Sequence, residues 1–178
     1  LAHRDLFEDG QFPERLAWNL LRDLLSALAE AHKQGLMHLD IKPANVLLAD
    51  DDRFVLTDFG IADALSASDV SKITSHGTKG YRAPEQDPKK ANLRIEMDQR
   101  TDLASVAKTV WAIAAGIDLF QEIERYVAAK KPEGLEIPPL SDVRQDISPE
   151  LSDILSPMMR INPDERPGSA AEVLAQVE

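Results

Sequence analysis

The clearest pattern in the chain is a helical repeat of leucines between residues 13 and 32. Apolar residues recur there at steps of three and four, the spacing that places side chains on one face of an α-helix. Pro13 suits a first helical turn and Gly35 suits a C-terminal stop. We therefore predict one long helix over 13–32 with a buried face made of Leu16, Leu20, Leu21, Leu24, Leu25 and Leu28.

Two short apolar runs follow this helix. They are Val46–Leu48 and Phe54–Leu56, and the polar residues 49–53 separate them. Apolar runs on either side of a short polar turn predict a β-hairpin. A hairpin brings the residues before its first strand and after its second strand to the same end.

Four polar side chains flank the predicted hairpin and are expected to converge at that end. Asp40, Lys42 and Asn45 precede the first strand. Asp58 follows the second strand. Mg²⁺ takes oxygen ligands, so Asn45 and Asp58 are candidate metal ligands. Asp40 would then be free to accept a hydroxyl proton, and Lys42 to neutralise charge on a transferred group, which is chemistry that suits phosphoryl transfer.

The rest of the chain alternates helical patterns with connectors. Leu36-Met37 predicts a short strand leading into the polar cluster, and residues 61–75, rich in Ser, Ala and Asp, predict an exposed loop. Thr101 is expected to cap a helix that ends near Gly116 and whose apolar stripe is Leu103, Val106, Val110, Ile113 and Ile117. Further helices are predicted over 119–130, 149–160 and 168–178. These patterns indicate one domain, or part of one, with α+β architecture that is mainly helical and has a small hairpin.

The composition of the chain limits the classes of partner that it can bind. The chain has 178 residues, a hydrophobic fraction of 43% and a net charge of −11, and it contains no cysteine. The acidic balance argues against a nucleic-acid or anionic-membrane surface, because both need clustered Lys and Arg. Without cysteine there is no disulfide framework and no thiolate metal site. We find no secretory signal and no segment long enough to span a bilayer, so we expect a cytoplasmic protein, with sequence upstream of Leu1 removed.

Three motifs in the sequence resemble those of the protein kinase family. Residues 38–45 read HLDIKPAN and resemble the catalytic loop H-x-D-x-K-P-x-N, and Asp58-Phe59-Gly60 resembles the metal-binding D-F-G turn. Residues 77–85 read GTKGYRAPE and resemble G-T-x-x-Y-x-A-P-E, the end of an activation segment that would run over 58–85. The resemblance implies a Ser/Thr protein kinase that uses ATP and Mg²⁺ and acts on the hydroxyls of a protein substrate.

The resemblance also implies roles for individual residues. Asp40, Lys42 and Thr78 would be catalytic, with Thr78 bridging the other two. Lys42, Asn45, Leu47 and Asp58 would bind the cofactors, with Asn45 and Asp58 as the metal ligands and Leu47 as the floor under the adenine base. The residues that would support this structure are His38, Phe59, Gly60, Glu85, Asp102 and Arg166. Among them, Asp102 is expected to bond the backbone of the catalytic loop, and Arg166 to pair with Glu85.

Two departures from the family pattern limit these expectations. Leu39 stands where most family members carry an Arg that pairs with a phosphorylated activation-segment residue. No G-x-G-x-x-G loop and no strand-borne Val-Ala-Ile-Lys occurs, so the resemblance covers only the larger, helical lobe and implies a truncated domain whose N-terminal lobe is missing. The chain alone is then expected to be inactive. The tetrapeptide His3-Arg4-Asp5-Leu6 imitates a catalytic loop but lacks the Lys and Asn that should follow.

Two other functions remain open at this stage. Small-molecule phosphotransferases share the H-x-D and Asn spacing, although they lack the Lys two residues after the Asp and the A-P-E segment. A non-catalytic, kinase-like scaffold is the other alternative. The intact Asp40, Lys42, Asn45 and Asp58 weaken the scaffold interpretation, and the missing lobe strengthens it.

Overall fold

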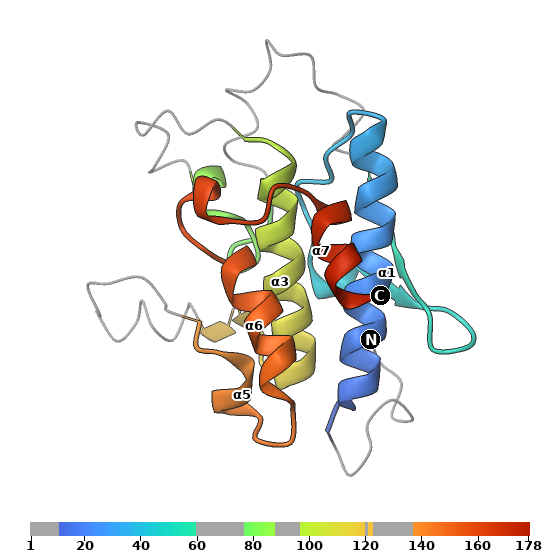
Figure 1. The fold of residues 1–178 in the computed structure, drawn as a ribbon, viewed down its shortest axis with the longest axis vertical. Coiled ribbons are helices and arrows are strands. Elements are labelled where there is room, and N and C mark those ends of the chain that lie inside the picture. The colour runs from blue at the N-terminus through green and yellow to red at the C-terminus, as the bar shows by residue number, and fades with distance from the viewer. Residues whose placement is uncertain (1–10, 60–76, 88–96, 120, 123–136) are drawn as a thin grey trace.

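The structure is a computed structural model that describes residues 11–59, 77–87, 97–119, 121–122 and 137–178. The helices and strands are α1 (Glu14–Lys33), β1 (Val46–Leu48), β2 (Phe54–Leu56), α3 (Gln99–Ala115), α5 (Leu140–Val143), α6 (Pro149–Met158) and α7 (Ala170–Val177). Helices dominate this part of the chain: α3 lies in the middle, with α1 on one side of it and α5 and α6 on the other (Figure 1).

Helix α1 forms as its leucine pattern predicts. It runs one residue later than predicted at each end, because Pro13 serves as the N-cap residue and Lys33 completes the last turn. All six leucines of the predicted stripe are buried. The buried face contacts α3, α7 and β2, so the amphipathic pattern of α1 is satisfied by packing on three other elements.

The hairpin also forms at the predicted residues. β1 and β2 pair antiparallel, with Val46 opposite Leu56 and Leu47 opposite Val55. Val46 and Leu56 face the core, whereas Leu47 and Val55 are 55% and 46% exposed on the other face. The backbone N–H of Phe54 donates to Asp23 Oδ2 of α1 at 2.7 Å, which fixes β2 against the helix.

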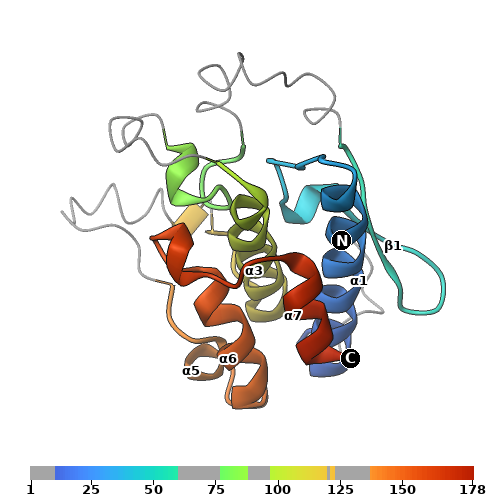
Figure 2. The same cartoon turned by 45° about the horizontal axis from the view of Figure 1, so that its top comes forward.

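Helix α3 is the central element of the fold, next to α1 and α6 in both views (Figures 1 and 2). It ends at Gly116, whose φ of 68° is the left-handed conformation common after a helix. The prediction that Thr101 caps this helix was wrong. The cap is Asp98, whose carboxylate accepts from Arg100 N–H at 2.8 Å. Thr101 lies inside the first turn, where its hydroxyl donates to a different partner, Glu85.

Three further differences from prediction concern short elements. Leu36-Met37 forms no strand, since no strand of the described residues lies beside it. The single turn α5 follows Pro139 and was not predicted, because four residues are too few to show a helical period. Helix α6 ends at Met158, two residues early.

Several predicted segments lie outside the described residues. They are the His3–Leu6 tetrapeptide, the loop over 61–75, most of the connector over 86–100 and most of the predicted helix over 119–130. Across the part of the chain that is described, the fold is rich in helix and has one small two-stranded antiparallel sheet. Among these residues no helix is long and apolar enough to cross a membrane.

Candidate active site

Three polar side chains from two distant segments form a compact hydrogen-bonded cluster. Lys42 Nζ donates to Asp40 Oδ2 at 2.6 Å and to Thr78 Oγ1 at 2.9 Å. Thr78 closes the triangle, because its backbone N–H and its hydroxyl both donate to Asp40 Oδ1, at 2.9 and 3.0 Å. The side chains of Lys42 and Asp40 remain 24% and 16% exposed, so a substrate can reach them. We call Asp40, Lys42 and Thr78 the open cluster.

The backbone that carries Asp40 is held in an unusual conformation. Leu39 is fully buried and has a φ of 65°, a left-handed value that costs energy for a residue with a branched side chain. Hydrogen bonds hold it from both sides. Its N–H donates to Asp102 Oδ1 at 2.8 Å, and its carbonyl oxygen accepts from Gln86 Nε2 at 2.8 Å. These two contacts fix the direction in which the next residue, Asp40, projects.

Asp102 holds the loop because it is the buried acceptor for three groups. Besides Leu39 N–H, its Oδ2 accepts from the backbone N–H of His38 at 2.8 Å and lies 2.9 Å from His32 Nε2. The Asp102 side chain is completely buried. A buried carboxylate with three donors is fully satisfied, so α3 and the loop are joined by a network that would be costly to leave unpaired.

His38 is buried under the loop rather than directed at a substrate. Its Nε2 lies 2.9 Å from the carbonyl oxygen of Thr57, which can only accept, so Nε2 carries the proton. Nδ1 then accepts from Asp40 N–H at 3.3 Å. The ring packs against Phe59 with centroids 4.6 Å apart and planes tilted by 54°. His38 therefore connects the loop to the segment after β2.

Two side chains with oxygen atoms that could bind a metal lie at the end of the hairpin next to this loop. Asn45 donates its amide N–H to Asp40 O at 2.9 Å, which leaves its side-chain oxygen directed elsewhere. The carbonyl of Asn45 accepts from Thr57 N–H at 2.9 Å, so Asp58 is one residue beyond that contact. Asp58 is exposed, has a φ of 70°, and makes no hydrogen bond to another residue that the structure describes. An amide oxygen and an exposed carboxylate fit the oxygen coordination of Mg²⁺.

A second charged cluster, of Glu85, Arg166 and Thr101, lies away from solvent, and we call it the closed cluster. Arg166 donates to both Glu85 oxygens, at 2.7 and 2.8 Å, and Thr101 Oγ1 donates to Glu85 Oε1 at 2.8 Å. The Glu85 and Arg166 side chains are completely buried. Burial alone would raise the pKa of Glu85, but the hydrogen bonds and charge of Arg166 outweigh it and hold that pKa below its ordinary value.

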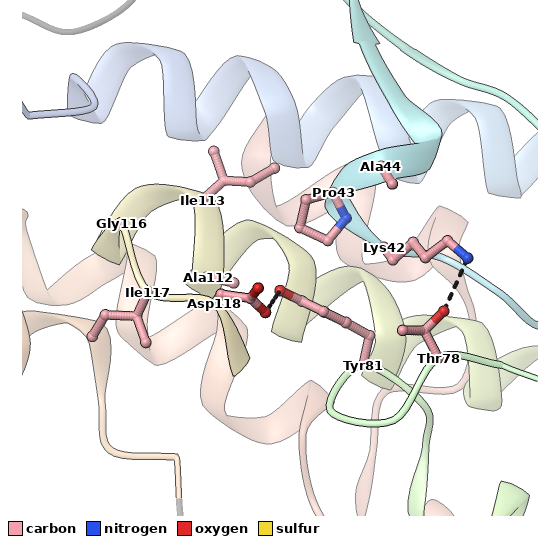
Figure 3. Close-up of a pocket in the computed structure, with 10 residues that line it drawn as sticks. All are labelled: Lys42, Pro43, Ala44, Thr78, Tyr81, Ala112, Ile113, Gly116, Ile117 and Asp118. Carbon is pink, nitrogen blue, oxygen red and sulfur yellow. Dashed lines mark hydrogen bonds between the residues drawn. The ribbon is translucent and has the colours of Figure 1, made fainter. Parts of the chain in front are cut away.

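A pocket of about 500 Å³ adjoins the open cluster (Figure 3). Lys42 and Thr78 form one side of it. The remaining lining residues come from the loop after Lys42, from the segment after Thr78, and from the C-terminal end of α3 and the residues that follow it. They are Pro43, Ala44, Tyr81, Ala112, Ile113, Gly116, Ile117 and Asp118.

The residues singled out from the sequence are distributed over these features. The open cluster, the Asn45 and Asp58 oxygens, and the His38–Phe59 contact lie at one end of the hairpin, and Leu47 is exposed on its outer face. Gly60 lies outside the described residues. Sequence reasoning missed Gln86, which is fully buried and bonds both the Leu39 carbonyl and Ala83 N–H. No pattern in the sequence signals the contact with the Leu39 carbonyl, which joins residues 47 positions apart.

Comparison with known proteins places the chain in a family. Residues 2–177 match the family described as protein kinase domain. The serine/threonine-protein kinase PknL of Mycobacterium tuberculosis is 30% identical over 174 residues, which cover 97% of this chain and 42% of PknL. The serine/threonine-protein kinase cds1 of Schizosaccharomyces pombe is 32% identical over 164 residues, covering 90% of this chain and 35% of cds1. The chain thus spans less than half the length of these two relatives.

Solved structures show the same likeness. The crystal structure of the Mycobacterium tuberculosis PknI kinase domain superposes with a TM-score of 0.65 at 28% identity, over 94% of this chain and 56% of that one. The crystal structure of Rad53 1–466 in complex with AMP-PNP gives a TM-score of 0.62 at 27% identity, over 93% of this chain and 40% of that one. From the family match and these structural neighbours, we conclude that the chain belongs to the protein kinase family.

Proposed function

We propose that the protein containing this chain transfers the γ-phosphoryl group of ATP to Ser or Thr hydroxyls of a protein substrate. The observation that carries the proposal is the open cluster. A carboxylate is held at a solvent-accessible position by a lysine and by a threonine from a separate segment. This is the arrangement needed to orient a hydroxyl next to a cation.

Each member of the open cluster has a role in the proposed reaction. The substrate hydroxyl oxygen attacks the γ-phosphorus, the bond from that phosphorus to ADP breaks, and the hydroxyl proton passes to the Asp40 carboxylate. Lys42 offsets negative charge on the transferred group. Thr78 fixes the carboxylate through Oδ1 and the ammonium through its hydroxyl, so that both keep their positions when substrate binds.

The nucleotide would bind at the end of the hairpin. Asn45 and Asp58 would hold Mg²⁺, which neutralises charge on the phosphates of ATP. The left-handed backbone of Asp58 supports this, because strained conformations cluster at functional sites. Its carboxylate is exposed and has no hydrogen-bond partner among the described residues, so it is accessible to a metal ion. His38, Phe59 and Asp102 would hold this end of the hairpin and the loop in place.

The outer face of the hairpin supports a second part of the proposal. Leu47 and Val55 are opposite one another and exposed, which is unusual for paired apolar side chains. We propose that they lie in a cleft, with Leu47 under the adenine base, and that a second lobe covers them. In this proposal the chain is the larger, helical lobe of the catalytic domain, with the catalytic loop at 38–45 and the activation segment at 58–85. Residues 1–178 alone would then fold without transferring phosphate.

The experiment compares the full-length protein with its Asp40→Asn variant. Each is incubated with radiolabelled ATP, Mg²⁺ and a Ser/Thr-containing protein or peptide mixture, and phosphate incorporation is measured. Losing a positioned proton acceptor is expected to lower the rate by roughly 10²–10⁴-fold. Asp153→Asn is the matched control, because Asp153 is exposed on α6 and outside the site. Its rate should equal that of the unmodified protein.

Two results would contradict the proposal. Equal rates in the Asp40→Asn variant and the unmodified protein would show that Asp40 does not take part. Absence of transfer by the unmodified protein to any Ser or Thr substrate would favour a non-catalytic scaffold.

A further inference from the structure

We propose that the pocket beside the open cluster binds an apolar side chain of the protein substrate, a few residues from the hydroxyl that receives the phosphate. This inference rests on the proposed function and adds a substrate class to it. The site would select substrates with a residue such as Leu, Ile, Met or Phe at one fixed distance from the acceptor Ser or Thr.

The pocket has the size and the walls for such a side chain. Its volume of about 500 Å³ lies inside the range of roughly 300–1,000 Å³ typical of ligand-binding clefts. Figure 3 shows its walls coming from three parts of the chain: the loop at Lys42–Ala44, the segment at Thr78–Tyr81, and the end of α3 with the residues that follow it. The apolar lining side chains are Pro43, Ala44, Ala112, Ile113 and Ile117.

The polar groups of the pocket are engaged with one another. Tyr81 donates its hydroxyl to Asp118 Oδ1 at 3.2 Å, a contact visible in Figure 3. Burial, followed by the negative charge of Asp118, raises the pKa of Tyr81 to about 12, so the hydroxyl keeps its proton and remains a donor. Lys42 Nζ is directed to Asp40 and Thr78. The surface left for an incoming group is therefore apolar.

The position of the pocket identifies its occupant as the substrate chain. Lys42 and Thr78 belong both to the pocket wall and to the open cluster. An acceptor hydroxyl at Asp40 therefore lies next to the pocket. An extended peptide advances about 3.3 Å per residue, so side chains a few positions from the acceptor pass over the opening.

The charge of the lining disfavours a basic side chain. Among the described residues that line the pocket, Asp118 is the only carboxylate, and it is exposed and bonded to Tyr81. A single solvated carboxylate attracts a cation weakly. Burying an apolar side chain against the five apolar lining residues gains free energy without a charged partner.

The test uses the full-length protein and a set of synthetic peptides. Each peptide has one Ser in a background of Ala and Gly, and a single Leu is moved from three residues before the Ser to three residues after it. A parallel set carries Arg instead of Leu. We expect one position at which Leu raises kcat/KM by roughly tenfold over Ala, the size of effect that a hydrophobic pocket gives for a few methylene groups. The Arg set should show no gain at that position.

Two variants connect the preference to this pocket. Ile117→Ala removes part of the wall and should lower the Leu preference several-fold. Ile161→Ala is the matched control, because Ile161 is 69% exposed and does not line the pocket.

Ala44→Glu places a carboxylate at an exposed position on the rim and should shift the preference from Leu towards Arg. Ser26→Glu adds the same charge at an exposed position on α1 and should not.

The outcomes separate this inference from the proposed function. Transfer to the peptides without any Leu preference, or with a preference for Arg in the unmodified protein, would overturn the inference and leave the kinase assignment standing. An unchanged Leu preference in both Ile117→Ala and Ala44→Glu would show that the side chain binds elsewhere. If no peptide and no protein is phosphorylated, the proposed function fails and the inference fails with it.

Discussion

The open and closed clusters are built from the same three kinds of group but differ in how they are satisfied. Each has a carboxylate, a cation and a threonine hydroxyl: Asp40, Lys42 and Thr78 in one, Glu85, Arg166 and Thr101 in the other. The carboxylate and cation are 16% and 24% exposed in the open cluster and completely buried in the closed one. Exposure therefore separates two sites that a list of residue types would not distinguish.

The hydrogen bonds of the cations show the same difference. Arg166 uses all five of its N–H donors, two on Glu85 and the others on the carbonyl oxygens of Arg100, Arg160 and Ile161. Lys42 is a single flexible ammonium at the surface of a pocket, with bonds to Asp40 and Thr78. The buried Glu85–Arg166 pair has no free hydrogen-bonding group for a substrate. In the open cluster, by contrast, a substrate group can replace one of the present hydrogen-bond partners. We infer that the closed cluster stabilises the fold and the open cluster does the chemistry.

The largest effect should follow from breaking the closed cluster on one side. Arg166→Met leaves the Glu85 carboxylate buried without its cation, which costs about 3–5 kcal/mol of the free energy of unfolding. Chemical denaturation of the full-length protein, followed by circular dichroism, measures the change. Adding Glu85→Leu should recover part of the loss, because the unpaired charge is then gone. If Arg166→Met alone is as stable as the unmodified protein, the Glu85–Arg166 pair does not stabilise the fold.

The next effect concerns Gln86, which joins the segment of the closed cluster to the loop of the open one. Gln86→Met removes the donor to the Leu39 carbonyl and the acceptor for Ala83 N–H, both buried, and should lower the free energy of unfolding by about 1–3 kcal/mol. Because Leu39 directs Asp40, kcat should fall by roughly tenfold or more while KM for ATP stays the same.

A matched control tests whether the position of Gln86 matters. Gln99→Met removes one exposed hydrogen bond, to the carbonyl of Gly168, and should change stability by less than about 0.5 kcal/mol. If Gln86→Met lowers stability but leaves kcat unchanged, Gln86 is structural only and does not position Asp40.

Lowering the pH should have a smaller effect on the free energy of unfolding. The pKa of Glu85 is held below its ordinary value of 4.5, so its ionised form stabilises the fold above that pH, and the contribution is lost as pH falls through the lowered pKa. The difference in unfolding free energy between the unmodified protein and Glu85→Gln should therefore be largest near neutral pH and shrink below pH 4.5. Urea titrations over this range measure it. A difference that grows with acidity would mean that the sign of the pKa shift is wrong.

The smallest effect, on activity, should come from removing phosphate groups from the activation segment. Leu39 is buried where most kinases carry an Arg, so it offers no cation to a phosphate on Ser66, Ser68, Ser71, Thr74 or Ser75. Activity should stay the same when purified active protein is treated with a phosphatase. A loss of tenfold or more that rephosphorylation restores would show that another basic group takes the place of the Arg.

The sequence predicts the elements that have a regular period and the contacts that follow from a hairpin. The leucine stripe of α1 and the two runs of the hairpin suffice for both elements, and the hairpin in turn brings Thr57, the residue before Asp58, to the carbonyl of Asn45. The cap of α3 was placed wrongly at Thr101. A threonine before an apolar run favours a cap locally, but here its hydroxyl is used by Glu85, which is distant in the sequence.

Other features could not be read from local patterns because they depend on tertiary contacts. Gln86 gives no periodic signal, and its role appears only when the Leu39 carbonyl lies beside it. The pocket is formed by Lys42, Thr78 and the end of α3, three segments far apart in the sequence. Its apolar character likewise depends on the Tyr81–Asp118 hydrogen bond, which links residues 37 positions apart.

The most direct test of the account exchanges the cation of each cluster for methionine and measures two quantities on each variant. In the full-length protein, Lys42→Met should lower the rate of phosphate transfer by roughly a hundredfold or more and change the free energy of unfolding by no more than about 0.5 kcal/mol. Arg166→Met should lower that free energy by several kcal/mol, as argued above. Normal phosphate transfer by Lys42→Met, or a loss of stability in it as large as that of Arg166→Met, would contradict the assignment of chemistry to the open cluster.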